Sequence, residues 1–337
     1  MDAAQTKNGR TLLYIYPVLI LIFIGVVILS LSMGAEWISP FELWRYITGQ
    51  TAGEYDFTIS MLRLPRVLLA ILVGGCLAVA GLILQSIIRN PLASPDIIGV
   101  TAGGSVGAMV FLVLFMGTIN IIWLPLFAIS GAAIVMFLIY GLSWKNGVTP
   151  NRLVLIGIGI AAAMQGLVSF MIVFSDTNVT TKAYIWMTGS IYGAVMKDVY
   201  QLLPWAVIGI LMTIMLARTV STLELGDELA TSLGVRVQLI RFSLLVLSVM
   251  LAGSAVAFAG GIGFIGLIAP HIAKKLISYS FVHLVPITAL IGAIMVAASD
   301  LVARTAFYPL DIPAGVFTAA IGAPFFIYLL YRNRYHN

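Results

Sequence analysis

Stretches of about twenty apolar residues recur along the whole chain, and they limit its possible folds more than any other feature. A helix needs roughly 20 mostly apolar residues to cross the hydrocarbon core of a bilayer. Apolar residues make up 61% of the 337 positions and charged residues only 9%, whereas about a quarter of a typical soluble domain is charged. With a mean hydropathy of +1.07, the chain has too little polar surface to cover a water-soluble globule. The sequence therefore predicts an all-α, polytopic membrane protein.

Ten of these stretches are predicted to span the membrane. They cover residues 12–33, 67–87, 97–116, 122–142, 153–174, 199–216, 240–259, 263–277, 284–303 and 312–331. The first is longer than a signal-peptide core of about 7–15 residues, so we predict that it remains as a span. The seventh and eighth are separated by little more than a Gly260-Gly261 turn. Residues 1–337 are thus predicted to form a single transmembrane domain of ten helices.

The distribution of Lys and Arg predicts the orientation of the chain. Ten spans place both termini on the same side of the membrane. If that side is the cytoplasm, 12 of the 18 basic residues lie inside and six lie outside, as the positive-inside rule requires. Both termini are therefore predicted to be cytoplasmic. The net charge of +5 does not indicate nucleic-acid binding, because the basic residues are scattered along the chain.

Several kinds of chemistry lack the residues that would support them. The chain has no Walker A pattern, so it is not predicted to cradle ATP phosphates by that device. A single cysteine, Cys76, excludes a disulfide scaffold, and His271 with His283 makes a poor metal site. No charged residue lies at the centre of any predicted span, which argues against a proton-coupled carrier. We predict no catalytic residue, no metal site and no bound cofactor in this chain.

A series of short motifs resembles one known family. In chain order they are Arg63-Leu-Pro-Arg66, Asn90-Pro-Leu-Ala-Ser-Pro95, Gly99-Val-Thr-Ala-Gly-Gly104, Trp186-Met-Thr-Gly189, Leu225-Gly-Asp-Glu-Leu-Ala230, Gly263-Phe-Ile-Gly-Leu-Ile-Ala-Pro-His271, Asp300-Leu-Val-Ala-Arg304, Ile312-Pro-Ala-Gly315 and Gly322-Ala-Pro324. Each motif alone is weak, but their order and spacing from about residue 37 to residue 330 resemble the FecCD-type permeases of ATP-binding-cassette (ABC) importers. These permeases move iron–siderophore chelates, haem and vitamin B12.

The resemblance implies a larger assembly in the bacterial cytoplasmic membrane. It implies a permease domain of ten spans that pairs with a second permease subunit, of the same or a different sequence, around one path. Two cytoplasmic ATPase subunits, which use the ATP, and an extracytoplasmic binding protein complete such importers. We expect an iron–siderophore complex as the cargo, with haem or vitamin B12 as alternatives within the family. An ion-coupled secondary carrier is the alternative from a different class.

Three arginines are expected to form a basic rim at the outer face, namely Arg63, Arg66 and Arg304. A guanidinium group pairs bidentately with carboxylates. By resemblance, arginines at these motif positions receive acidic residues of the binding protein. The alternatives are snorkelling to lipid phosphates for all three and a buried structural role for Arg66.

The segment of residues 221–237 is expected to seat the ATPase. Its residues of interest are Glu224, Leu225, Gly226, Asp227, Glu228, Leu229, Leu233 and Gly234. Acids alternate with leucines and glycines punctuate the segment, a pattern typical of a short amphipathic helix that sets an apolar ridge into a groove on a partner. The alternative is a helix that lies on the membrane interface, but such helices prefer Lys and Arg on their polar face.

A gate is expected at the outer end of the fifth span. The residues there are Ser175, Asp176, Thr177 and Asn178. By resemblance, small polar residues at this place narrow the path, although the acid Asp176 departs from that pattern. A plain surface turn accounts for the same residues. Gln85 and Gln165 are candidate path residues within spans, and Gln85 has an interhelical hydrogen bond as its alternative role.

Overall fold

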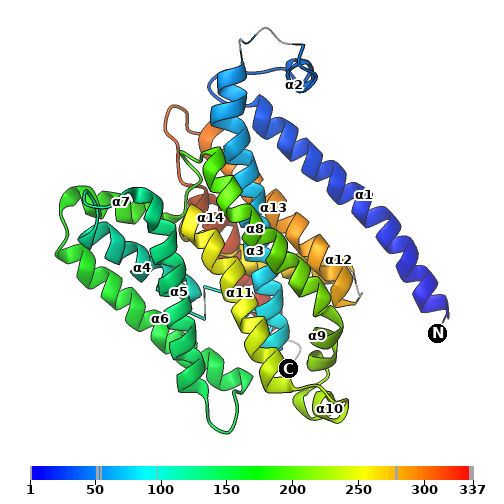
Figure 1. Cartoon of the computed structure of the whole chain (residues 1–337). Helices are drawn as coiled ribbons and strands as arrows, with labels where there is room; N and C mark the ends of the chain where they lie inside the picture. Colours follow the sequence, from blue (N-terminus) through cyan, green and yellow to red (C-terminus); the bar gives the residue numbers. More distant parts are fainter. Residues whose placement is uncertain (1, 51–52, 54, 97, 278–279, 334–337) are drawn as a thin grey trace.

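The structure, a computed structural model, describes residues 2–50, 53, 55–96, 98–277 and 280–333. Throughout this described part the regular structure is helical (Figure 1). The helices are α1 (Asp2–Ser32), α2 (Pro40–Ile47), α3 (Leu64–Ile88), α4 (Val100–Leu114), α5 (Leu124–Ser143), α6 (Pro150–Val173), α7 (Thr177–Thr188), α8 (Met196–Met215), α9 (Ala217–Glu224), α10 (Asp227–Ser232), α11 (Val237–Ala259), α12 (Ile265–Leu276), α13 (Phe281–Thr305) and α14 (Ala314–Asn333). A π-helical turn, Thr58–Arg63, leads into α3, and a 3₁₀ turn, Ile121–Trp123, precedes α5.

All ten predicted apolar segments are helical, but two of them are short. Eight helices of the described residues are long and apolar enough to cross a membrane. The other two predicted spans correspond to α4, with 15 residues, and α12, with 12 residues. At 1.5 Å per residue they are about 22 and 18 Å long, shorter than a hydrocarbon core of about 30 Å. The all-α, multi-span prediction is confirmed, whereas full-length helices for these two segments are not.

Local backbone chemistry explains where the two short helices begin. The segment before α4 contains Pro91 and Pro95, and Gly99 caps the helix at φ +87°. Before α12, Gly260 and Phe264 have positive φ, in a turn that is rich in glycine. Proline lacks an amide hydrogen and glycine readily adopts positive φ, so both segments interrupt a helix that hydropathy alone would continue.

Helix α3 is the centre of the bundle. It is buried along nearly its whole length and packs against α8, α11, α12 and α13 (Figure 1). The contacts are close because glycines face each other. A Cβ added at Gly81 would lie 1.8 Å from the carbonyl oxygen of Gly266, and one added at Gly74 would lie 2.2 Å from that of Gly292. Small residues thus let backbones meet where no hydrophobic drive exists between helices in lipid.

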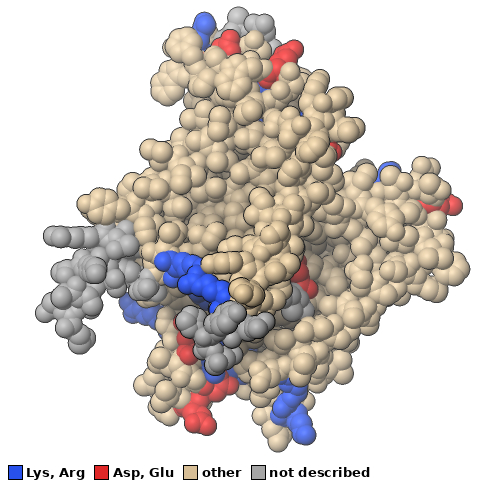
Figure 2. All heavy atoms as spheres, turned by 180° about the vertical axis from the view of Figure 1, so that it is seen from behind, with Lys and Arg blue, Asp and Glu red and all other residues tan. Residues whose placement is uncertain are grey.

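A second group of helices, α4 to α7, stands beside this bundle (Figure 1). Here too glycine packs tightly against backbone, because a Cβ added at Gly107 in α4 would lie 2.1 Å from the carbonyl oxygen of Phe127 in α5. The start of α1 and the α9–α10 segment lie toward one end of the molecule, and α2 lies at the opposite end (Figure 1). Charged atoms gather mainly at the two ends, and the middle of the face seen in Figure 2 is largely uncharged.

We expect Gly81→Ala to destabilise the protein, because the new methyl group would overlap the backbone of Gly266. Overpacking of this kind costs about 1–3 kcal/mol. The measurement is the thermal unfolding midpoint of the purified protein in detergent. Gly166→Ala is the matched control, since a Cβ there meets no atom within 4 Å. Equal midpoints for the two variants would contradict the role of this contact.

Candidate functional site

The structure brings together the three arginines that were expected at the outer rim, but it buries them. Arg66, at the start of α3, donates to both carboxylate oxygens of Asp300 in α13 over 2.8–3.0 Å. It also donates to both oxygens of Asp311 over 2.6 and 2.8 Å. Its side chain is 10% exposed and that of Asp300 is 3% exposed. Arg66 therefore occupies the buried structural position that was its alternative.

Arg63 and Arg304 hold the end of α1. Arg63 donates to the carbonyl oxygens of Leu31 and Ser32 over 2.6 and 2.8 Å, and to that of Glu36 over 2.6 Å. Arg304 donates to the carbonyl oxygen of Ser30, and its Nε lies 3.8 Å from Asp300. The last carbonyls of a helix have no partner within the helix, so these guanidinium groups satisfy the C-terminus of α1.

In this cluster the arginines of the expected basic rim are bonded within the chain, and their role in docking stays a prediction. Within the chain, Arg63, Arg66 and Arg304 are already bonded to carboxylates and to carbonyl oxygens that are distant in sequence. Three guanidinium groups face the carboxylates of Asp300 and Asp311, and the exposed carboxylate of Glu36 also acts on Arg63, so the charges of the cluster nearly balance. Arg45 on α2, at the same end of the molecule, is an exposed basic residue. The sequence did not show this arrangement because the acidic partners lie more than 200 residues away.

The segment expected to seat the ATPase, residues 221–237, forms an exposed apolar ridge at the opposite end. Leu225, Leu229 and Leu233 are 61%, 57% and 67% exposed. Leu225 caps the end of α9, Leu229 lies within α10 and Leu233 caps the end of α10, so the three exposed leucines follow the α9–α10 segment. Gly226 and Gly234 have φ of +120° and +83°, so both turns need a residue that tolerates positive φ. The exposed acids Glu224 and Glu228 border the ridge.

Asp227 fixes the ridge to the bundle instead of facing outward. It accepts hydrogen bonds from Arg241 in α11 at 2.8 and 2.9 Å, and it pairs with Arg89, the residue that caps α3. Burial raises the pKa of the Asp227 carboxyl, but the bonds and charges of Arg241 and Arg89 outweigh it and hold that pKa below its usual value. Arg89 also donates to the carbonyl oxygen of Leu223 at 3.0 Å. The segment is thus tied to two core helices.

Of the expected gate residues, Ser175 and Asp176 lie in the turn between α6 and α7, and Thr177 and Asn178 are the first two residues of α7. The hydroxyl of Ser175 donates to the carbonyl oxygen of Met171 at 2.6 Å, while Asp176, Thr177 and Asn178 are exposed. Gln165 is exposed on α6, on a side that also carries Ala162, Gly166 and Ser169. Gln85 is elsewhere and buried. Its amide donates to the carbonyl oxygen of Leu267 at 3.3 Å and accepts from Lys274 at 3.3 Å, which is the interhelical bond given as its alternative.

The sequence missed one acid in the interior, Asp96. It precedes α4, where the prediction placed the inner end of a span, and the interior was therefore expected to hold no carboxylate. In the structure Asp96 accepts hydrogen bonds from the Thr101 hydroxyl and the Phe264 amide. It lines a cavity of about 300 Å³ together with Ser94, Gly263, Phe264, Leu267 and Phe326. The glycine and proline breaks before α4 and α12 were the signal that could have located it.

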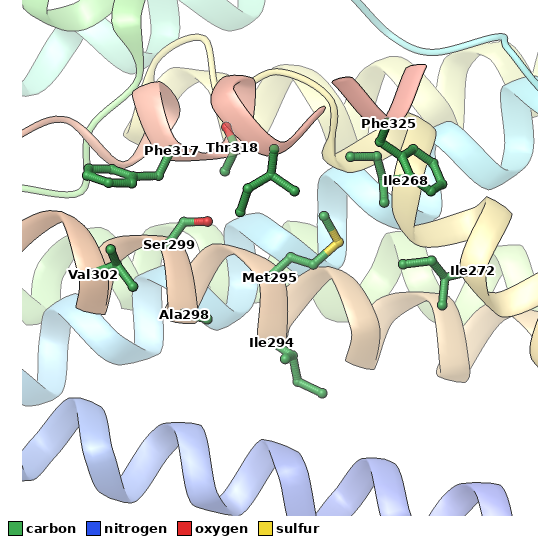
Figure 3. A pocket seen from close by; sticks show the side chains of 11 residues that line it. Ile268, Ile272, Ile294, Met295, Ala298, Ser299, Val302, Phe317, Thr318 and Phe325 are labelled. Atoms are coloured by element: carbon green, nitrogen blue, oxygen red, sulfur yellow. The ribbon is translucent and has the colours of Figure 1, made fainter. Parts of the chain in front are cut away.

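A second cavity, of about 390 Å³, lies between α12, α13 and α14. Figure 3 shows side chains of α13 and α14 facing one another across it. Its lining is almost wholly apolar, with Met295, Phe317 and Phe325 among the large side chains. Of its two hydroxyls, that of Thr318 already donates to the carbonyl oxygen of Gly315. This cavity offers little to a polar cargo, so the interior site of interest is the one at Asp96.

We expect Arg66→Ala to destabilise the protein strongly, because it leaves Asp300 buried without its main partner. Removing one member of a buried ion pair costs about 3–5 kcal/mol. Arg45→Ala is the control, since changes at exposed positions usually stay within about 0.5 kcal/mol. The fraction of monodisperse protein after a heating series in detergent measures both variants. If Arg66→Ala resists heat as well as Arg45→Ala, the cluster does not hold these helices together.

Known proteins resemble this chain over almost its whole length. The model of the FecCD transport family matches residues 20–332. The achromobactin transport system permease protein CbrC of Dickeya dadantii is 46% identical over 316 residues, which are 94% of this chain and 90% of that protein. The iron(3+)-hydroxamate import system permease protein FhuG of Bacillus subtilis is 40% identical over 97% of this chain and 98% of its own length. The Fe(3+) dicitrate transport system permease protein FecD of Escherichia coli is 38% identical over 92% of this chain and 96% of its own length.

Among solved structures, one described as an inward-facing conformation of a putative metal-chelate type ABC transporter is similar to this chain. The TM-score is 0.81 at 29% identity, and the match covers 96% of this chain and 99% of that one. The PsaBC structure from Streptococcus pneumoniae shares the fold at a TM-score of 0.55 and 16% identity, over 85% of this chain and 94% of that one.

Proposed function

The chain belongs to the FecCD transport family, and from this premise we propose that it is the permease subunit of an ABC importer that carries an iron–siderophore complex across the cytoplasmic membrane. The observation that supports the cargo most directly is the 46% identity with the achromobactin permease, extended by relatives named for iron(3+)-hydroxamate and iron(3+)-dicitrate transport. A permease of this kind works with ATPase and substrate-binding partners. We propose that this chain binds no cofactor and that ATP is hydrolysed by the ATPase subunits.

The ridge of Leu225, Leu229 and Leu233 is the proposed seat of the ATPase. Three leucines that are more than half exposed outside the membrane span need a partner to cover them. The ties of Asp227 to Arg89 and Arg241 make the seat rigid toward α3 and α11. A movement of the ATPase against these leucines would therefore be transmitted to α3 and α11. Coupling of ATP hydrolysis to transport requires such a connection.

The proposed topology has ten membrane-embedded segments and cytoplasmic termini. Helices α4 and α12 are paired with the non-helical segments before them, and together these fill the membrane depth that neither short helix spans alone. The start of α1 and the ridge lie toward the same end of the molecule (Figure 1). If the ridge binds a cytoplasmic ATPase, the N-terminus is cytoplasmic, in agreement with the charge distribution.

We propose that the binding protein docks on the opposite end, over the cluster of Arg63, Arg66 and Arg304. Arg45, which is exposed on α2 at this end, attracts acidic side chains, and the bonds of Arg63 and Arg304 fix the end of α1. The path and its gate are proposed along the exposed side of α6, from Gln165 to residues 175–178. Small and polar residues there suit a passage better than contact with lipid. A second permease subunit would complete the passage.

We expect ATP-driven uptake when the protein is reconstituted with its binding protein and ATPase in liposomes. Radioactive iron, supplied as a ferric siderophore, should accumulate only when the liposomes contain ATP. A proton or sodium gradient without ATP should give no uptake. Uptake driven by such a gradient in the absence of the ATPase would instead establish an ion-coupled secondary carrier.

We expect Leu225→Asp and Leu233→Asp to abolish recovery of the ATPase with the permease. Interfaces concentrate their energy in a few apolar anchors, and a carboxylate buried without a partner is costly. Thr231→Asp adds the same charge at an exposed position of α10 outside the leucine row and serves as the matched control. Co-purification and uptake are measured for each variant. Normal ATPase recovery with both leucine variants would exclude this ridge as the seat.

A further inference from the structure

Asp96 lies deep in the membrane-embedded part of the molecule. After Arg89 the chain turns back into the bundle, and Pro95 packs against α12 and α3. A Cβ added at Gly266 would lie 2.9 Å from Cδ of Pro95 and 3.0 Å from the carbonyl oxygen of Leu77. Leu77 is near the midpoint of α3, so the segment that carries Asp96 has returned to about the middle of that helix. Ile98 similarly touches Gly157, the eighth residue of α6.

Two short helices begin beside this carboxylate. Helix α4 starts at Val100 and α12 starts at Ile265, and each contributes a donor, from the Thr101 hydroxyl and from the Phe264 amide. The N-terminus of a helix carries partial positive charge, which stabilises an anion. This arrangement allows a carboxylate to remain in an apolar setting. Ionisable side chains in such a setting are costly and are usually functional.

The carboxylate still has room for a ligand. An ionised carboxylate has about four lone-pair sites, and two donors are assigned to Asp96. Among the described residues, no Lys or Arg forms an ion pair with it. Its side chain lines the cavity of about 300 Å³, where it is the ionisable member of the lining. The remaining acceptor sites therefore face a space that a guest molecule can enter.

We propose that Asp96 is a cargo-contacting residue of the translocation path. It accepts hydrogen bonds from chelates that present hydroxyl, amide or ammonium groups, and it disfavours polyanionic ones. This inference rests on the proposed function, because it concerns the selectivity of that transport. This contact is a single weak interaction. It therefore favours some cargoes over others without binding any of them so tightly that transport stops. The apolar cavity of Figure 3 lacks such an acceptor.

Gly263 provides a probe position beside the carboxylate. A Cβ added there has Oδ2 of Asp96 as its neighbour at 3.9 Å, with open space otherwise. The natural cysteine, Cys76, is completely buried, and Cys76→Ala removes it. In the Cys76→Ala background we would introduce Gly263→Cys and measure its reaction with a cationic and an anionic methanethiosulfonate reagent, in the complex with the ATPase.

We expect the cationic reagent to react at least about fivefold faster than the anionic one, relative to their rates with a free thiol, because the carboxylate lies within a few ångströms. Adding Asp96→Asn should abolish this preference. Asparagine retains an oxygen that accepts from Thr101 and Phe264, so the packing is kept while the charge is lost. Asp96→Glu, which keeps the charge, is the matched control and should retain the preference. A carboxylate that carries no charge, or that is sealed off from the cavity, would leave the ratio of rates unchanged when Asp96→Asn is added.

The Gly263→Cys variant also tests whether the cargo comes close to Asp96. A binding protein loaded with ferric siderophore, together with ATP, should slow modification of Gly263→Cys, and the empty binding protein should not. A thiol that is unreactive toward both reagents, equal relative rates, or no protection by cargo would each overturn the inference. If Asp96→Asn does not assemble, the reagent preference of the Gly263→Cys variant alone decides. Uptake by the unmodified complex is measured separately, so a failure of the proposed function is recognised independently of Asp96.

Discussion

The close contact of glycine backbones around α3 is the constraint on which the rest of the structure depends. Lipid provides little drive for apolar helices to associate, so association rests on packing and on interhelical bonds. Gly74 and Gly81 allow α13 and α12 to approach α3 within backbone contact. Helices α8 and α11 also pack on α3, while α4 and α5 join the bundle through α11 and α14 joins it through α13. The arginine cluster closes it at one end, and the Asp227 ties close it at the other.

The two interrupted helices, α4 and α12, introduce polar groups into this otherwise apolar core. A continuous helix satisfies all of its backbone groups internally and presents only side chains to the bilayer. Helices α4 and α12 instead begin within the bundle, where their free amides need a partner. Asp96 supplies one, and its presence creates a polar point next to a cavity. The same breaks that shorten two helices therefore place the one interior carboxylate that the sequence did not lead us to expect.

Charge in this protein is used mainly to fix segments in place. Arg63, Arg66 and Arg304 bind carboxylates and helix-terminal carbonyls, and Asp227 binds two arginines. The links of Arg66 to Asp300 and of Arg89 to Asp227 join segments that are 234 and 138 residues apart in sequence. The two ends of the molecule therefore offer different surfaces to partner proteins. One end presents a leucine ridge that is bordered by acids, and the other presents the exposed Arg45 at the same end as the buried ion-pair cluster.

The sequence by itself determined the helical, multi-span architecture, since hydropathy over about twenty residues reports the medium that surrounds a helix. It also indicated an amphipathic segment at residues 221–237, where acids alternate with leucines, and the seat of the ATPase there stays a prediction. Only the tertiary structure decided that the rim arginines are buried, that Gln85 bonds to Leu267, and that Asp96 lies in the interior. The partners of these residues are 182 or more residues away for Arg66 and Gln85, and 168 away for Asp96 at Phe264. A local pattern reports polarity, whereas burial and bonding depend on contacts that form only when the helices pack.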